Sequence, residues 1–216
     1  FDILLQAETG FLSMTGNNKE YAKMPVALID VLAAHQIKEG ILTAIIQQLK
    51  TPKAIKVSTT LEETAIASLM NQSSNYLMAG HIAQPMGTLH PNIAPYGEII
   101  ETFDNEKLIL AIGTDLQFQK FSKIIALEEK YVQQFSENIE RVRNRNYLLT
   151  IINEKTRKFK SENLLAICVN QNIPVGKIKN LEKVLNSTIA KKMVLTENVN
   201  NETTQRIKTV AFQLSY

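Results

Sequence analysis

The chain has 216 residues, enough for one large domain or two modest ones. Its apolar share of 44% is ordinary for a protein with a folded core, which excludes a disordered or fibrous chain. The formal net charge is only +3, with acidic and basic residues interspersed, so the charge does not point to nucleic acid as a partner. Polar residues interrupt every apolar run before the roughly 20 residues that a membrane-spanning helix needs.

Residues 1–24 are mixed in polarity, and their glycine and asparagine turn signals predict loops and short extended pieces. An apolar segment follows from Pro25, and helical periodicity predicts a helix over 31–50. The apolar residues of this helix fall on one arc: Val31, Ala34, Ile37, Ile41, Leu42, Ala44, Ile45 and Leu49.

The β-branched residues of segment 54–61 predict a strand after the break at Pro52. Residues 62–79 return to a helical pattern, which Gly80 closes. The stretch from Gly80 to Pro95 is rich in turn residues and is the best candidate for a linker.

A second domain is indicated beyond the linker, where residues 96–113 predict two strands joined by a turn at Asp104 and Asn105. Further elements are expected in chain order: helices at 115–125, 130–135, 146–159, 161–170 and 181–185, then strands at 194–199 and 206–216.

The single cysteine, Cys168, cannot form an internal disulfide and lies in the apolar stretch LLAICVN. Without histidine or arginine nearby in the sequence, a buried structural thiol is favoured over a reactive one. This cysteine usage suits a reducing compartment, so we expect a cytoplasmic protein. The three histidines are too scattered for metal-site spacing.

Asp30 is the strongest functional candidate because it stands between two apolar runs in PVALIDVLAAHQIKEGILTAII, residues 25–46. A partly desolvated carboxylate can act as a nucleophile when it is held against an electrophile in a site that excludes water. The more economical role from position alone is that of a helix N-cap, whose side chain accepts a hydrogen bond from a first-turn amide. Sequence position leaves both roles open.

The run ERVRNRN places Arg141, Arg143 and Arg145 at alternate positions. A phosphate-binding or nucleic-acid patch is one interpretation. Glutamates are interspersed through this region and aromatic stacking partners are few, so a solvated helix face with one structural arginine is favoured.

Several segments together carry a resemblance to a known family. They are FDILLQAETGFLSMTG at 1–16, the Asp30 stretch at 25–46, GTLHPNIAPYGEI at 87–99, FSENIERVRNRNYLL at 135–149, NIPVGKIKNLEKVL at 172–185 and RIKTVAFQLS at 206–215. In this order they resemble the class III coenzyme A transferases, the family of the formyl-CoA and carnitine CoA-transferases. The resemblance covers essentially the whole chain.

The resemblance implies that Asp30 is a catalytic nucleophile. In the family, the matching aspartate attacks an acyl-CoA thioester, forms a mixed anhydride, and becomes an aspartyl-CoA thioester before a second acid accepts CoA. Gly87, Thr88 and His90 match a glycine-rich loop that shields the anhydride from water, although only Gly87 of the glycines is present here. His90 is a candidate proton shuttle or substrate contact, whereas a histidine before a proline is more often structural or exposed.

The fold implied by the resemblance is α/β: the end of a Rossmann-like large domain plus a smaller α+β domain, in an interlocked homodimer. Residues 1–85 are then part of the large domain with the catalytic-aspartate helix, 86–180 the small domain, and 181–216 a return segment to the large domain. The chain opens with Phe1 instead of methionine, so we expect a fragment or a processed chain. The cofactor-binding residues are expected upstream of Phe1.

The expected substrates are acyl-CoA and a carboxylic acid, with no tightly bound cofactor, no metal, and neither nucleic acid nor membrane as a partner. Two alternatives stay open. Related acyl-CoA racemases share the fold but deprotonate the α-carbon with a histidine–aspartate pair, whose histidine would lie upstream of Phe1. The chain could instead be a non-catalytic half that needs a partner subunit. No G-x-S-x-G, Walker or G-x-G-x-x-G sequence supports a hydrolase, an NTPase or a dehydrogenase.

Overall fold

The computed structural model describes residues 1–17 and 20–215. The chain divides into two compact units, Phe1–Pro91 and Asn92–Tyr216. The division falls inside the turn-rich stretch that the sequence favours as a linker. The finer assignment of three segments to a large and a small domain stays a prediction.

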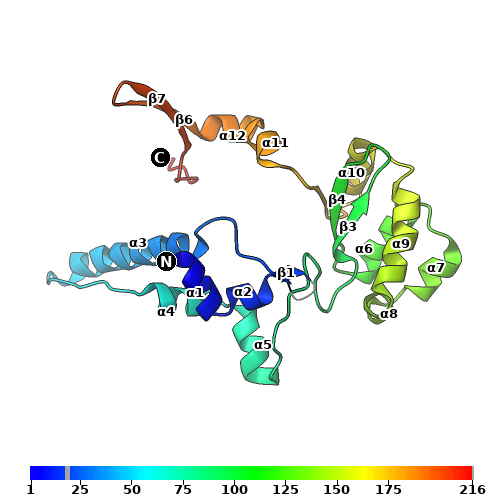
Figure 1. Cartoon of the computed structure of the whole chain (residues 1–216), viewed down its shortest axis with the longest axis horizontal. Coiled ribbons are helices and arrows are strands. Elements are labelled where there is room, and N and C mark those ends of the chain that lie inside the picture. The colour runs from blue at the N-terminus through cyan, green and yellow to red at the C-terminus, as the bar shows by residue number, and fades with distance from the viewer. Residues whose placement is uncertain (18–19, 216) are drawn as a thin grey trace. The chain divides into compact units, whose positions relative to one another are not determined.

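The first unit consists mainly of helices. They are α1 (Asp2–Glu8), α2 (Phe11–Met14), α3 (Leu28–Lys50), α4 (Leu61–Ala67) and α5 (Asn71–Ala79), and strands β1 (Gly16–Asn17) and β2 (Glu20–Tyr21) form a short antiparallel pair. Both α1 and α4 pack against α3, as Figure 1 shows. The expectation of loops over 1–24 is wrong for α1 and α2, whose short lengths and the left-handed Gly10 between them hide the helical period.

The predicted long helix is confirmed as α3, but the apolar arc expected to be its buried face is not the face that is buried. Its fully or nearly buried residues are Ile29 and Ala33, neither of which belongs to the predicted apolar arc. Most large members of that arc are exposed instead, Leu49 to 82%, whereas Ile37 is half-buried. Within the described residues no other element covers these exposed side chains. The prediction of the buried face fails because periodicity indicates an apolar face without showing which surface buries it.

Segment 54–61 forms no strand before α4 begins, so the strand prediction is wrong. A strand needs a neighbouring strand to exchange backbone hydrogen bonds, and none of the described strands pairs with this segment. It lies against α3 at Gly40, where an added Cβ would come within 2.5 Å of Val57 Cγ1. The pattern of β-branched residues therefore reflects an extended chain packed on a helix.

The predicted helix over 62–79 is divided in two. Thr60 and Glu63 form a capping box that starts α4, with each side chain bound to the other residue's backbone N–H. Met70 has φ 50 and separates α4 from α5. Gly80 ends α5 in the left-handed conformation, as predicted.

The second unit contains a three-stranded antiparallel sheet in the order β3-β4-β5. Its elements are β3 (Tyr96–Glu101), β4 (Lys107–Ala111), α6 (Asp115–Ile124), α7 (Glu129–Gln134), α8 (Asn138–Arg143), α9 (Arg145–Thr156), α10 (Ser161–Asn170) and β5 (Val175–Lys177). Helix α9 contacts β3 (Figure 1), and α10 contacts β5. The hairpin and the helices that the sequence predicts here are confirmed.

The core of the second unit lies between this sheet and its helices. It includes Ile100, Leu108, Leu110, Ile112, Phe118, Phe121, Phe135, Leu148, Ile152, Leu164 and Cys168. Burial raises the pKa of the Cys168 thiol to about 11, because an apolar environment disfavours the thiolate. This confirms the prediction of a buried structural thiol.

Arg141 is the largest fully buried side chain. Its guanidinium donates hydrogen bonds to the carbonyl oxygens of Ala94, Phe135 and Ser136 at 2.6, 2.9 and 3.0 Å, and it pairs with Asp115 at 2.5 Å. The prediction of one structural arginine in this run is confirmed. It was incomplete, because the side chain of Arg145 is also only 11% exposed.

The chain ends with α11 (Leu181–Leu185), α12 (Thr188–Met193) and an antiparallel pair of strands, β6 (Val194–Val199) and β7 (Glu202–Ile207). Helix α11 and strand β6 have the predicted bounds. The predicted last strand is wrong beyond Ile207, since residues 208–215 form no strand.

Candidate active site

Asp30 is the third residue of α3, so the N-cap interpretation is wrong. The helix begins at Leu28, and the N-cap position is occupied by Ala27, whose methyl group cannot accept a hydrogen bond. The first-turn amides therefore need another acceptor.

The missing cap comes from α1. Asp2 Oδ1 accepts the backbone N–H of Ile29 at 2.7 Å, across 27 positions of the sequence. Asp2 Oδ2 accepts a hydrogen bond from Gln6 Nε2 at 2.5 Å, and Gln6 Oε1 accepts the N–H of Met24 at 3.0 Å. Gln6 is 1% exposed and Ile29 is fully buried. The pair therefore ties α1 both to the start of α3 and to the segment that leads into it.

The carboxylate of Asp30 makes no hydrogen bond or ion pair with any residue in the described part of the chain. It is exposed and lines an open hollow of about 460 Å³. The other lining residues are Phe1, Asp2, Ile3, Lys23, Val26 and Ala27. The nucleophile candidate thus faces a space with apolar walls, one lysine and the Asp2 carboxylate, at the positive end of a 23-residue helix.

The loop residues that the sequence assigns to the substrate lie elsewhere in the first unit. Gly87 has φ +63 and donates its N–H to the carbonyl oxygen of Gly16 at 2.6 Å. Thr88 is exposed and His90 half-buried, and both interact with their surroundings. The loop is therefore held against the short β1 strand.

Gly87 lines a smaller hollow of about 120 Å³, together with Met14, Gln72 and His81 among others. None of Gly87, Thr88 or His90 lines the hollow at Asp30. The described residues do not bring the loop and the aspartate together, and their pairing at one site stays a prediction.

Asp2, Gln6 and Lys23 were missed by sequence reasoning. The signal in the sequence was the i, i+4 pair of Asp2 and Gln6 within an apolar helix, where a buried amide needs a partner. The other partners, Met24 and Ile29, are distant in the sequence, so no local pattern reveals the contact.

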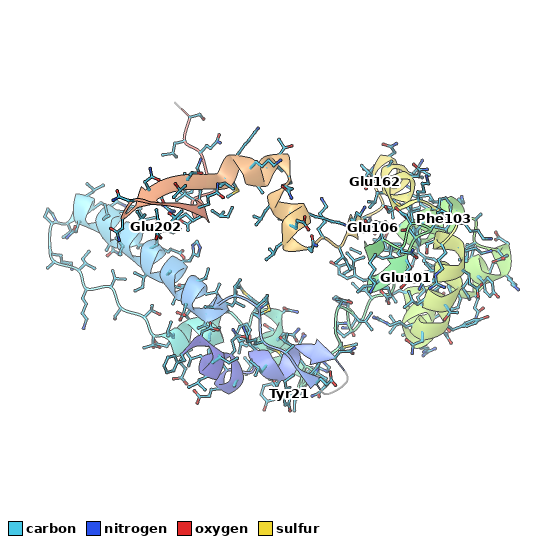
Figure 2. All side chains as sticks on the ribbon, turned by 45° about the horizontal axis from the view of Figure 1, so that its top comes forward. Tyr21, Glu101, Phe103, Glu106, Glu162 and Glu202 are labelled. Atoms are coloured by element: carbon cyan, nitrogen blue, oxygen red, sulfur yellow. The ribbon has the colours of Figure 1, made fainter. Side chains whose placement is uncertain are left out.

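A charged cluster of the second unit links three of its elements. Lys177 Nζ lies 3.1 Å from Glu162 and 3.4 Å from Glu106, two residues labelled in Figure 2. The hydrogen bond to Glu162 and the charges of both carboxylates raise the pKa of Lys177. These ion pairs join β5, α10 and the β3–β4 turn.

Among the described residues, no group of three or more histidine, cysteine, aspartate or glutamate side chains could hold a metal ion. Nor does any helix in the described part of the chain have the length and apolar character needed to cross a bilayer.

The mixed α/β fold agrees with the family that the sequence resembles. The chain matches the model of CoA-transferase family III over residues 1–216, and it therefore belongs to this family.

Among curated relatives, a succinate–glutarate CoA-transferase of Agrobacterium fabrum is 30% identical over 190 residues, covering 85% of this chain and 46% of the relative. A human succinyl-CoA:glutarate CoA-transferase is 27% identical over 186 residues, covering 85% of this chain and 42% of the relative. The chain thus spans less than half the length of these relatives.

Solved structures confirm the fold. A CaiB/BaiF family protein of Brucella suis matches with a TM-score of 0.78 and 28% identity, over 98% of this chain and 56% of that one. A Mycobacterium tuberculosis protein, Rv3272, matches with a TM-score of 0.80, over 100% of this chain and 58% of that one. Its sequence identity is 17%, so it supports the fold alone.

Proposed function

We propose that the protein containing this chain transfers CoA from an acyl-CoA to a carboxylic acid through a covalent intermediate on Asp30. The observation that carries the proposal is the Asp30 carboxylate itself, which has no partner among the described residues and lines an open hollow at a helix N-terminus. The names of the curated relatives support CoA transfer between acids.

The reaction has four balanced steps. The Asp30 carboxylate attacks the thioester carbonyl, the C–S bond breaks, and CoA leaves as a thiolate, so that a mixed anhydride of Asp30 and the donor acid remains. The thiolate attacks the aspartyl carbonyl and releases the donor acid as a carboxylate, which leaves an aspartyl-CoA thioester. The acceptor carboxylate attacks this thioester and expels the thiolate. The thiolate then attacks the acceptor's carbonyl in the new anhydride and frees Asp30.

The surroundings of Asp30 suit these steps electrostatically. Each addition places negative charge on a carbonyl oxygen next to the N-terminus of α3, where the helix dipole is positive. We assign Gly87, Thr88 and His90 to a loop that keeps water from the anhydride, supported by their match to the family loop. This role requires the loop to approach Asp30 during turnover.

Dicarboxylic acids are the substrates that we propose. The relatives are named for succinate and glutarate, which carry a second carboxylate. Lys23 lines the hollow together with Asp30, while Ile3, Val26 and Ala27 give it apolar walls. A cation beside an apolar wall suits a short methylene chain that ends in a carboxylate.

We propose that the chain acts within a homodimer or with a separate CoA-binding half, in the cytoplasm. The uncovered apolar face of α3 supports a partner surface. The chain covers only 46% and 42% of the two curated relatives, which supports CoA binding by residues beyond this chain. The one buried cysteine agrees with a reducing compartment.

The test is to trap the intermediate. The protein is incubated with acyl-CoA and treated with hydroxylamine, which converts an aspartyl thioester or anhydride to a hydroxamate that peptide mass spectrometry locates. We expect the label on Asp30, and we expect Asp30→Ala and Asp30→Asn to reduce CoA transfer by at least about 10³-fold while the protein stays folded. Retained transfer in either variant contradicts the mechanism.

A second readout separates transfer from racemisation. Solvent deuterium entering the α-carbon of acyl-CoA, without exchange of CoA between acids, would indicate racemase chemistry. The absence of both reactions, in a protein that forms a stoichiometric complex with a separate CoA-binding subunit, would indicate a non-catalytic half.

A further inference from the structure

The start of α3 has an unusual arrangement of carboxylates. Helices of globular proteins are commonly capped by a side chain at the N-cap itself, but Ala27 holds that position here. The Ile29 N–H is satisfied by Asp2, at 2.7 Å, from another helix. Asp30, one residue further along, keeps its carboxylate free of the described residues.

The cap fixes the backbone immediately before Asp30. A hydrogen bond to a charged acceptor is among the stronger ones, and this one holds the N–H of a fully buried residue. Ile29 is the direct neighbour of Asp30 in the first turn. Locking its amide therefore limits how the Asp30 Cα–Cβ bond can move relative to the hollow.

Gln6 extends the same control to the wall of the hollow. Its buried amide donates to Asp2 and accepts from Met24, so both ends are used. Met24 is the neighbour of Lys23, which lines the hollow with Asp30. One chain of hydrogen bonds thus connects the residue before Asp30 with the residue after Lys23. Asp30 and Lys23 both line the hollow where we propose that the substrate binds.

We propose that Asp2 and Gln6 are positioning residues for the Asp30 nucleophile: they cap α3 in place of Asp30 and fix the backbone on both sides of its hollow. The inference rests on the proposed function of Asp30. It gives Asp2 and Gln6 no contact with the reacting atoms. Their effect is on the rate at which Asp30 attacks.

The directions of the hydrogen bonds allow a sharp test. Asp2→Asn places an amide NH₂ against the Gln6 amide NH₂, two donors without an acceptor. Gln6→Glu places two carboxylates against each other. In the double variant the introduced amide donates to the introduced carboxylate, and each still offers an oxygen to the Ile29 and Met24 N–H groups. The double variant has the same net charge as the wild type.

The measurement is the single-turnover rate of acylation of Asp30 in the protein that contains this chain, followed by quenched flow and hydroxylamine trapping. It is made well below the unfolding midpoint of every variant, with KM for the acyl-CoA donor measured alongside. Glu8→Gln, an exposed change of the same chemistry on α1, is the matched control.

We expect each single variant to slow acylation by about 10- to 100-fold at little changed KM, since small misplacements of a nucleophile have effects of this size. The double variant should return to within about 3-fold of wild type, and Glu8→Gln should match wild type. Asp2→Glu keeps the charge but moves it by one methylene, so it should be slowed while remaining folded.

A lower unfolding midpoint with unchanged acylation in all variants would show that the pair only stabilises the fold, and would overturn the inference. A double variant that is as stable as wild type yet as slow as the single variants would also overturn it. If wild-type protein is labelled elsewhere than Asp30, the proposed function itself fails, which the wild-type trapping detects independently of the variants.

Discussion

Asp2 of α1 and Asp30 of α3 lie at the start of α3, and in the mechanism that we propose they divide two tasks that conflict within one side chain. A carboxylate that caps a helix uses its lone pairs on backbone N–H groups, which stabilise its charge and make it a weaker nucleophile. Asp2 takes this task through Ile29, and Asp30 takes none of it. The arrangement keeps the field of the helix N-terminus at Asp30 without binding its oxygens.

Arg141 illustrates the opposite use of a charged residue, which is wholly structural. We expect Arg141→Met to lower the free energy of unfolding of the second unit by about 3 kcal/mol or more, because the carbonyls of Ala94, Phe135 and Ser136 lose their donor in a buried place. Urea denaturation followed by circular dichroism measures the change.

Arg143→Met is the matched control for Arg141. Its side chain is 67% exposed and pairs with Glu140 within one helix, so its removal should change stability by at most about 0.5 kcal/mol. Equal effects of the two substitutions would contradict the structural role of Arg141.

At the scale of elements, the β3–β4 hairpin carries two carboxylates whose pKa values move in opposite directions. Hydrogen bonds from Ser161 and Thr102 lower the pKa of Asp104, which links the turn to the start of α10. Burial raises the pKa of Glu98 on β3, against the opposing charge of Arg145 at 3.3 Å.

The signs of these shifts predict opposite pH dependences. Asp104 stabilises the fold when ionised, so its contribution is complete above its unfolded pKa near about 4 and declines as the pH falls below that value. Glu98 favours its protonated form in the fold, so stability falls as the pH rises from about 4 through its raised folded pKa.

We therefore expect Asp104→Asn to lower the thermal midpoint at pH 7 and to differ less from wild type near pH 3. Glu98→Gln should remove the loss of stability above about pH 4 that the wild-type carboxylate causes. The measurement is the thermal midpoint of each variant and of the wild type between pH 3 and 7. Parallel pH profiles for the two variants would contradict the assigned shifts.

Elements with local signals could be predicted from the sequence. Helix α6 begins where Thr114 and Gln117 form a capping box, and the hairpin turns where Asn105 adopts φ 55. The segment 54–61 could not be assigned in this way, because its β-branched residues show an extended backbone but not whether a strand lies beside it. The packing of Val57 at Gly40 depends on contacts that form only after folding.

The candidate site was predictable to a similar extent. Asp30 is identified by its apolar surroundings and by the resemblance to the family, but its place inside the helix depends on where α3 starts. That start is set partly by Asp2, 27 positions before the amide that it caps. Lys23 carries no local signal at all, and only the shape of the hollow brings it to the side of Asp30.

At the scale of the whole molecule, α3 presents apolar side chains that nothing in the described residues covers. Val31, Ile41, Leu42, Ile45, Ile46 and Leu49 are all about half or more exposed. Exposed apolar patches on this scale mark surfaces that bind other protein surfaces. The chain covers 46% of the Agrobacterium fabrum relative, so more than half of that protein has no counterpart among these residues.

We expect the α3 face to be buried in the assembled protein that contains this chain. Ile45→Glu and Leu49→Glu together should then weaken assembly, because two charges are placed in an apolar contact without partners. Light scattering after size-exclusion chromatography should show loss of the assembled species, and CoA transfer should fall with it at dilute protein concentration.

The control for this last experiment changes the polar side of the same helix. Gln36→Glu and Gln47→Glu add the same charge at exposed positions on that side, with little change in apolar area. Assembly should survive this pair. If both pairs of substitutions leave the mass and the activity unchanged, the exposed residues of α3 face solvent in the working protein, and their role is limited to holding Asp30 at the start of a long, rigid helix.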